Sequence, residues 1–132
     1  MTSSSNAASW LALLGRLLIV PLFLFSVTGK INAPDATAAK IAAAGIPLAS
    51  VSVWLTILIE LGGAVLLVIG WRTRLVAFVL AVFVLANALF FHNNFNDVGQ
   101  TIHFLKNLAI IGGLLQIVAF GPGAFSLDAR RR

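Results

Sequence analysis

Residues 51–91 read VSVWLTILIELGGAVLLVIGWRTRLVAFVLAVFVLANALFF, two long apolar runs separated only by the polar turn WRTR at 71–74. A helix needs about 17 to 25 mainly apolar residues to cross the hydrocarbon core of a bilayer, and each run has that length. Because unpaired backbone groups are not tolerated in lipid, and these runs lack the alternation of barrel strands, they must be helical. The stretch therefore predicts a transmembrane helical hairpin.

Two further apolar runs flank this hairpin, so the expected spans are residues 10–29, 51–70, 75–92 and 104–121. Hydrophobic residues make up 60% of the chain and charged residues 10%, whereas soluble domains have roughly 45 to 50% and 25%. The expected fold class is an all-α membrane protein, with a bundle of four transmembrane helices in a single domain over residues 1–132. A short helix is expected at 34–45 in the first outer loop, between Pro34 and Gly45.

The basic residues that give a net charge of +5 are scattered or terminal, so nucleic acid is not an expected partner. The chain has no cysteine, which excludes thiolate redox chemistry and thiolate metal sites. Residues 1–9 carry no Lys or Arg, so the first run is interpreted as a retained span and not as a signal peptide. Five Lys or Arg lie near the span ends on the side of the termini and three on the other side, which predicts that both termini are cytoplasmic.

Ionisable residues inside the spans are the most informative feature, because an unpartnered charge in a bilayer is costly. Glu60 falls near the middle of the second span and Arg16 lies in the inner part of the first, so we expect the two to form an ion pair between these helices. Asn87 of the third span falls level with Glu60 and is expected to bond to it, and Gln116 of the fourth faces inward near the depth of Arg16. These four residues form the expected buried polar site, for a quinone or a proton.

A second polar group is expected at the outer ends of the spans, forming a cationic vestibule of Lys30, His92, His103, Lys106 and Asn107. Such a vestibule suits an anion or a quinone carbonyl. The alternatives stay open: the Arg16 and Glu60 pair is either a functional site or a structural clasp, and Lys30 and Lys106 are also placed to extend towards the membrane surface. No metal site is expected, since His92 and His103 lack any recognised ligand spacing.

Several short motifs together resemble the DoxX family of small bacterial inner-membrane proteins, and the resemblance covers almost the whole chain. They are Gly15-Arg16, Gly29-Lys30, Glu60-Leu-Gly-Gly63, Gly70-x-x-Thr-Arg74, Phe104-Leu-Lys-Asn107 and Gly121-Pro-Gly-Ala-Phe-Ser-Leu-Asp128. The resemblance implies a four-helix membrane bundle in the bacterial inner membrane. It also implies association with membrane redox or oxidative-stress complexes, since the family takes its name from a subunit of a thiosulfate:quinone oxidoreductase. The positions that match family motifs are Arg16, Lys30, Glu60, Lys106 and Asn107.

Three functions are compatible with these features. The leading hypothesis is a quinone-interacting subunit of a membrane redox complex, with quinone as the cofactor and a membrane or soluble redox protein, or a second copy of the chain, as partner. The second is a non-catalytic scaffold or accessory subunit that docks a larger enzyme. The third is a small proton-coupled transporter. Stand-alone catalysis is not expected, because the sequence holds no nucleophile and base constellation and no phosphate-binding loop.

Overall fold

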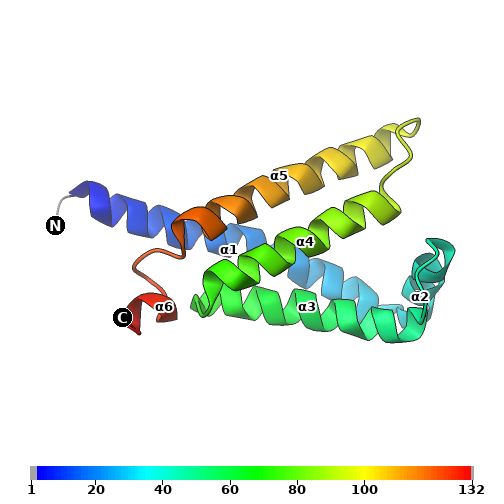
Figure 1. Cartoon of the computed structure of the whole chain (residues 1–132), viewed down its shortest axis with the longest axis horizontal. Coiled ribbons are helices and arrows are strands. Elements are labelled where there is room, and N and C mark those ends of the chain that lie inside the picture. The colour runs from blue at the N-terminus through cyan, green and yellow to red at the C-terminus, as the bar shows by residue number, and fades with distance from the viewer. Residues whose placement is uncertain (1–2, 132) are drawn as a thin grey trace.

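The computed structural model describes residues 3–131, and helices account for most of them. They are α1 (Ser3–Asn32), α2 (Pro34–Ala43), α3 (Ala49–Ile69), α4 (Thr73–Phe91), α5 (Val98–Phe120) and α6 (Leu127–Arg130). The described residues contain no strand. In Figure 1 the start of α1 and the short α6 lie at one end of the molecule, and α2 and the loop at 92–97 lie at the other. The expected all-α fold is confirmed.

Four of the helices, α1, α3, α4 and α5, are long and apolar enough to cross a membrane. Two of them differ from the expected spans. α1 extends beyond residues 10–29 at both ends, and α5 begins at Val98, six residues before the predicted start at residue 104. The early start of α5 follows from Asp97, whose side chain accepts hydrogen bonds from the backbone N–H groups of Gly99 and Gln100 and so caps the helix.

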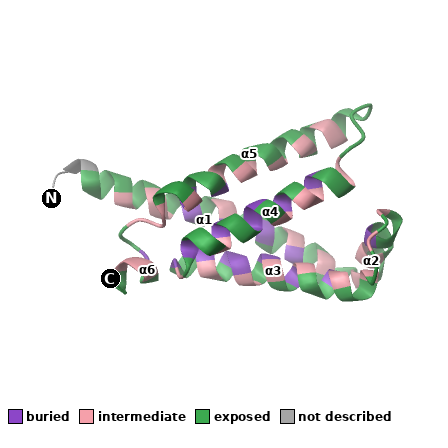
Figure 2. Ribbon diagram, viewed as in Figure 1, coloured by how far each residue is buried: buried purple, intermediate pink, exposed green. Residues whose placement is uncertain are grey.

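The core lies where the four long helices face one another. Leu67, Leu80 and Leu114, from α3, α4 and α5, are almost completely buried and pack with Val20 and Phe23 of α1. Large apolar side chains on the outer faces remain uncovered, and Figure 2 shows the buried residues confined to the inner faces of the helices. An apolar exterior of this extent is unfavourable in water and favourable in a bilayer.

The helices pack as two pairs. α1 packs chiefly on α3 and α4 chiefly on α5, while α3 and α4 meet over a smaller area. Gly63 permits the close approach of α3 to α4, because a Cβ atom at this position would lie 2.8 Å from a methyl group of Leu80. The buried residues of α5 are Leu114 and Ile117, fewer than on α3 or α4. α5 is therefore the peripheral helix of the bundle (Figure 1).

The short helix α2 confirms the expectation for the first loop, and it ends two residues earlier than predicted. Pro34 occupies its first turn, and the chain leaves the helix near Gly45, which has a left-handed φ of 85°. Ile41 is buried and packs with Val27 of α1 and with Val53 and Ile57 of α3. This second apolar cluster attaches α2 across the ends of α1 and α3.

Candidate functional site

Arg16 lies in the interior of the bundle with an exposed fraction of 1%. Its Nη1 donates hydrogen bonds to the carbonyl oxygens of Leu67 at 2.6 Å and Val68 at 3.2 Å, and its Nη2 donates to the carbonyl oxygen of Phe125. The last carbonyls of an α-helix have no partner within the helix and carry partial negative charge. Arg16 therefore neutralises the C-terminal end of α3 and also ties the end of the chain to it.

The predicted ion pair between Arg16 and Glu60 is wrong. Arg16 is level with Leu67 and Val68, at the very end of α3, because the beginning of α1 projects past that end. Glu60 is level with Ser26, which is ten residues after Arg16, or about 15 Å further along the helix. That distance is beyond the reach of an arginine side chain.

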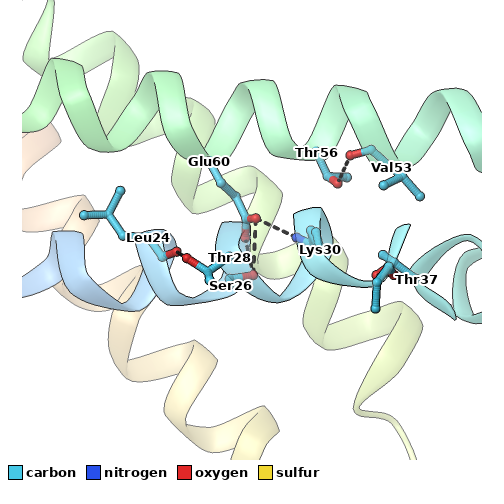
Figure 3. A network of polar contacts seen from close by, with 9 residues as sticks. Leu24, Ser26, Thr28, Lys30, Thr37, Val53, Thr56 and Glu60 are labelled. Atoms are coloured by element: carbon cyan, nitrogen blue, oxygen red, sulfur yellow. Dashed lines mark hydrogen bonds and ion pairs between the residues drawn. The ribbon is translucent and has the colours of Figure 1, made fainter. Parts of the chain in front are cut away.

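Glu60 instead pairs with Lys30, whose Nζ lies 2.6 Å from Oε2, as Figure 3 shows. The Ser26 hydroxyl donates to the same carboxylate, at 3.0 Å from Oε1 and 3.2 Å from Oε2. The exposed fraction of the Glu60 side chain is 4% and that of Lys30 is 17%. The Lys30 ammonium also lies 5.4 Å from the centre of the Phe83 ring on α4. A buried charge pair thus links α1 to α3 at the level where α4 contacts them.

The end of the chain forms a second polar assembly, which we call the C-terminal clasp: Arg16, Gly70, Thr73, Phe125 and Asp128. The Asp128 carboxylate accepts hydrogen bonds from the backbone N–H of Arg72 at 2.8 Å, and from the backbone N–H and hydroxyl of Thr73 at 2.8 and 2.7 Å. Its own N–H donates to the carbonyl oxygen of Gly70 at 2.9 Å. The clasp therefore fastens the turn between α3 and α4 to the chain after α5.

Gly70 and Asp128 show how local chemistry fixes this clasp. Gly70 ends α3 with a left-handed φ of 72°, and a Cβ atom there would collide with the Cβ of Ser126. Partial burial by itself raises the pKa of the Asp128 carboxyl. The hydrogen bonds from Thr73 and Arg72, with the nearby Arg131 charge, outweigh that effect and hold this pKa below its ordinary value.

The other expected members of the buried site lie apart from Glu60. Asn87 is half-buried on α4, but both oxygens of Glu60 are occupied by Ser26 and Lys30, and the described residues show no bond between Asn87 and Glu60. Gln116 was predicted to face inward and is exposed. The prediction for Gln116 is wrong because α5 is covered on one side only, by α4 and part of α1, so that much of its circumference faces outward.

The expected outer vestibule is divided in the structure. His92 and His103 stack with ring centres 5.0 Å apart, at the end where α4 and α5 meet. Burial and the neighbouring His103 lower the pKa of His92, so this imidazole is mostly neutral at pH 7. Lys106 is exposed and Asn107 half-buried on α5, and Lys30 is held by Glu60.

Sequence reasoning missed Ser26 and Asp128 as partners of buried groups. Ser26 and Lys30 are four residues apart, a spacing that places both on one face of α1, and this signal pointed to a shared partner. Asp128 is the last residue of the motif at 121–128, and the spacing of that motif gives no indication of its partners.

The polar groups around Glu60 are hydrogen-bond donors, a carboxylate and an aromatic ring. Within residues 3–131, no group of three or more His, Cys, Asp or Glu side chains is placed to hold a metal ion. Lys30 and Ser26 offer donors, Glu60 offers a proton-accepting carboxylate, and Phe83 offers an aromatic face. These four side chains, from α1, α3 and α4, form the polar cluster around Glu60.

Comparison with known proteins agrees with this description. The DoxX family model matches residues 11–93, which include Arg16, Lys30 and Glu60. The chain is 38% identical to the Escherichia coli inner membrane protein YqjF over 88% of each chain, and 30% identical to the E. coli inner membrane protein YphA over 91% of this chain and 89% of YphA.

A more distant similarity, at 24% identity, joins nearly the whole chain to 37% of the yeast ER-derived vesicles protein ERV29. No solved structure matches. The two bacterial relatives are named inner membrane proteins, and the four apolar helices require a lipid bilayer around this chain. Since the family model covers more than half of the sequence, the chain belongs to the DoxX family.

Proposed function

We propose that this protein is a non-catalytic subunit of a larger membrane complex, in which it serves as a scaffold for an enzyme. The observation that carries the proposal is that the buried charges at 16, 30 and 60 are bonded to groups of the same chain. Their chemistry is used to hold the bundle together. The contacts with partner proteins are therefore expected on the outer faces of the bundle.

The bonds of Arg16 support a structural role for this residue. Both terminal nitrogens of its guanidinium donate to backbone carbonyls from two segments that are far apart in sequence, the end of α3 and the chain at Phe125. Backbone carbonyls have no reactivity for Arg16 to assist. Their positions depend on it, because a buried carbonyl that loses its donor is destabilised by about 1 to 3 kcal/mol.

The Lys30 and Glu60 pair supports the same proposal. A buried ion pair adds little net stability compared with a well-packed apolar pair, but it can specify which helices pair and in what register. Here the pair joins α1 to α3, with Ser26 completing the bonding of the carboxylate. We interpret it as a device that fixes the register of these two helices.

The test replaces the ion pair with an apolar pair of similar size, in the double variant Lys30→Met with Glu60→Leu. Proteins that co-purify in mild detergent are identified by mass spectrometry for the wild type, the double variant and the single variant Glu60→Gln. A scaffold keeps its partner in the double variant at the wild-type ratio. If the double variant melts at the wild-type temperature but loses the partner, the ion pair itself is required for partner binding and the scaffold proposal fails.

The second candidate function is quinone interaction, favoured by the aromatic ring of Phe83 beside the Lys30 ammonium. In this hypothesis Lys30 donates a hydrogen bond to a quinone carbonyl and Glu60 takes part in proton uptake. Lipid extracts of the purified protein are then expected to contain near-stoichiometric quinone that disappears in Glu60→Gln. Equal quinone in the wild type and in Glu60→Gln counts against this hypothesis and leaves the scaffold proposal intact.

A further inference from the structure

Two adjoining hollows lie beside the C-terminal clasp, at the end of the bundle where α3, α4 and α5 meet the chain at 121–129. Their volumes are about 310 and 320 Å³. Both are lined by Arg74, Pro122 and Asp128, and the second extends along the chain from Phe120 to Ala129. Arg74 thus stands between the two hollows and belongs to both.

Arg74 is a cation without a counter-charge in the described part of the chain. Its guanidinium lies over Gly121, where a Cβ atom would be 3.2 Å from both Nε and Nη2. The nearby carboxylate is that of Asp128, and its oxygens are occupied by the Arg72 N–H and by Thr73. Among residues 3–131, Arg74 has neither a hydrogen bond nor an ion pair.

The surroundings of Arg74 are cationic and also apolar. Arg72, Arg130 and Arg131 are exposed at this same end of the bundle, where Asp128 supplies the one carboxylate among residues 3–131. Leu75 lines the first hollow and is 56% exposed, and Phe120 lines the second and is 78% exposed. A ligand that suits this site therefore has an anionic group to contact the arginines and an adjoining hydrocarbon portion to contact Leu75 and Phe120.

The position of the hollows relative to the membrane narrows the class of ligand further. Arg74 is the second residue of α4, and Phe120 is the last residue of α5. Both helices are membrane spans, so their ends lie at the boundary where phospholipid phosphates are found. Basic hollows at the ends of transmembrane helices are a known setting for anionic head groups.

We infer that these hollows bind the phosphodiester group of an anionic phospholipid, with Arg74 as its main contact. The planar guanidinium donates two parallel hydrogen bonds to phosphate oxygens, and the glycerol and the first acyl carbons rest against Leu75 and Phe120. Inorganic phosphate shares the charge and the donors but not the apolar contacts. This is a defined site, distinct from the general attraction of exposed arginines to an anionic surface.

The experiment is native mass spectrometry of the full chain in detergent, titrated with phosphatidylglycerol and, separately, with phosphatidylcholine. The variants are Arg74→Gln and the matched control Arg130→Gln, which removes the same charge from an exposed residue that lines neither hollow. We expect Arg74→Gln to weaken phosphatidylglycerol binding by about tenfold or more, the loss of a hydrogen-bonded charge contact. Arg130→Gln is expected to weaken it by less than about fivefold, the effect of one surface charge.

Equal losses in the two variants would overturn the inference, because they would indicate diffuse attraction. Equal binding of phosphatidylglycerol and phosphatidylcholine would also overturn it. Displacement of the lipid by millimolar inorganic phosphate would overturn the lipid as the occupant. If Arg74→Gln does not fold, Arg74→Lys serves instead, since it keeps the charge and loses the planar fork, and it is expected to bind the lipid less tightly than the wild type does.

Discussion

Two buried charges of this protein are stabilised in opposite ways. Arg16 of α1 lies beside the C-terminal end of α3, where it donates hydrogen bonds to the neutral carbonyl groups of Leu67, Val68 and Phe125. Glu60, near the middle of α3, is bonded to a full positive charge on Lys30 of α1. The difference follows from position, because the end of a helix offers unpaired carbonyls to a cation and the middle of a helix offers none. A charge in mid-helix therefore needs a side-chain partner, and for Glu60 that partner is Lys30 of α1.

The largest effect that this comparison predicts is for Arg16→Ala. The substitution removes three donors at once and leaves three carbonyls without their partner, so we expect the free energy of unfolding to fall by about 3 kcal/mol or more. Unfolding in mixed micelles of mild detergent and dodecyl sulfate measures this change. The neighbouring Leu17→Ala, on an exposed face, is the control. A loss below about 1 kcal/mol would mean that the carbonyls of α3 do not depend on Arg16.

The second effect concerns the other charge. Lys30→Met removes the cationic partner of the Glu60 carboxylate, and we expect the free energy of unfolding to fall by about 2 kcal/mol, moderated because Ser26 still donates to Glu60. Ser26→Ala is expected to cost about 1 kcal/mol, the value of a single hydrogen bond. The same unfolding assay compares the two variants. An equal loss in both would show that charge contributes no more at this site than a hydroxyl does.

Much of the fold could be predicted from the sequence, whereas the pairing of its charges could not. Hydropathy located the spans because burial in lipid depends only on composition along one segment. The partner of Glu60 depends on how far α1 slides along α3. Arg16 and Lys30 lie on nearly the same face of α1, so the helical period did not distinguish them. If the two spans began at the same depth in the membrane, Arg16 would be the partner of Glu60. Because α1 projects past the end of α3, Arg16 lies at the end of α3 instead, and the prediction is wrong.

A third prediction concerns Asp128, which supports the Arg16 end of the bundle from outside the spans. Asp128→Ala is expected to lower stability by about 1 kcal/mol, as for the loss of a helix cap. Because the folded protein has the lower pKa, this contribution is present above the ordinary aspartate pKa of about 4 and is lost as the pH falls through the lowered value. Stability profiles of wild type and variant should therefore run parallel at neutral pH and converge in acid. Convergence near pH 7 would contradict the assignment.

The smallest predicted effect lies at the far end, where His92 stacks on His103. The pKa of His92 is lowered in the folded protein, so its contribution to stability is full above its ordinary value of 6.5 and declines as the pH falls below that. His103 of α5 is the titratable group that faces it. Hydrogen exchange of residues 90–104, corrected for the intrinsic rate, should increase on acidification in the wild type and not in His92→Gln. An equal increase in hydrogen exchange in His92→Gln would show that a group other than His92 causes the pH dependence.

The bond from Arg16 to Phe125 joins residues 109 positions apart, and this separation matters while the protein is being made. The first span is synthesised before any of the three carbonyl acceptors of its guanidinium, and the carbonyl of Phe125 is the last of the three to be made. Assembly of the bundle cannot finish until the ribosome has released the segment that carries Phe125 and Asp128. A chain stopped before residue 125 would keep the spans α1, α3, α4 and α5 and would lack the carbonyl group that completes the hydrogen bonding of Arg16.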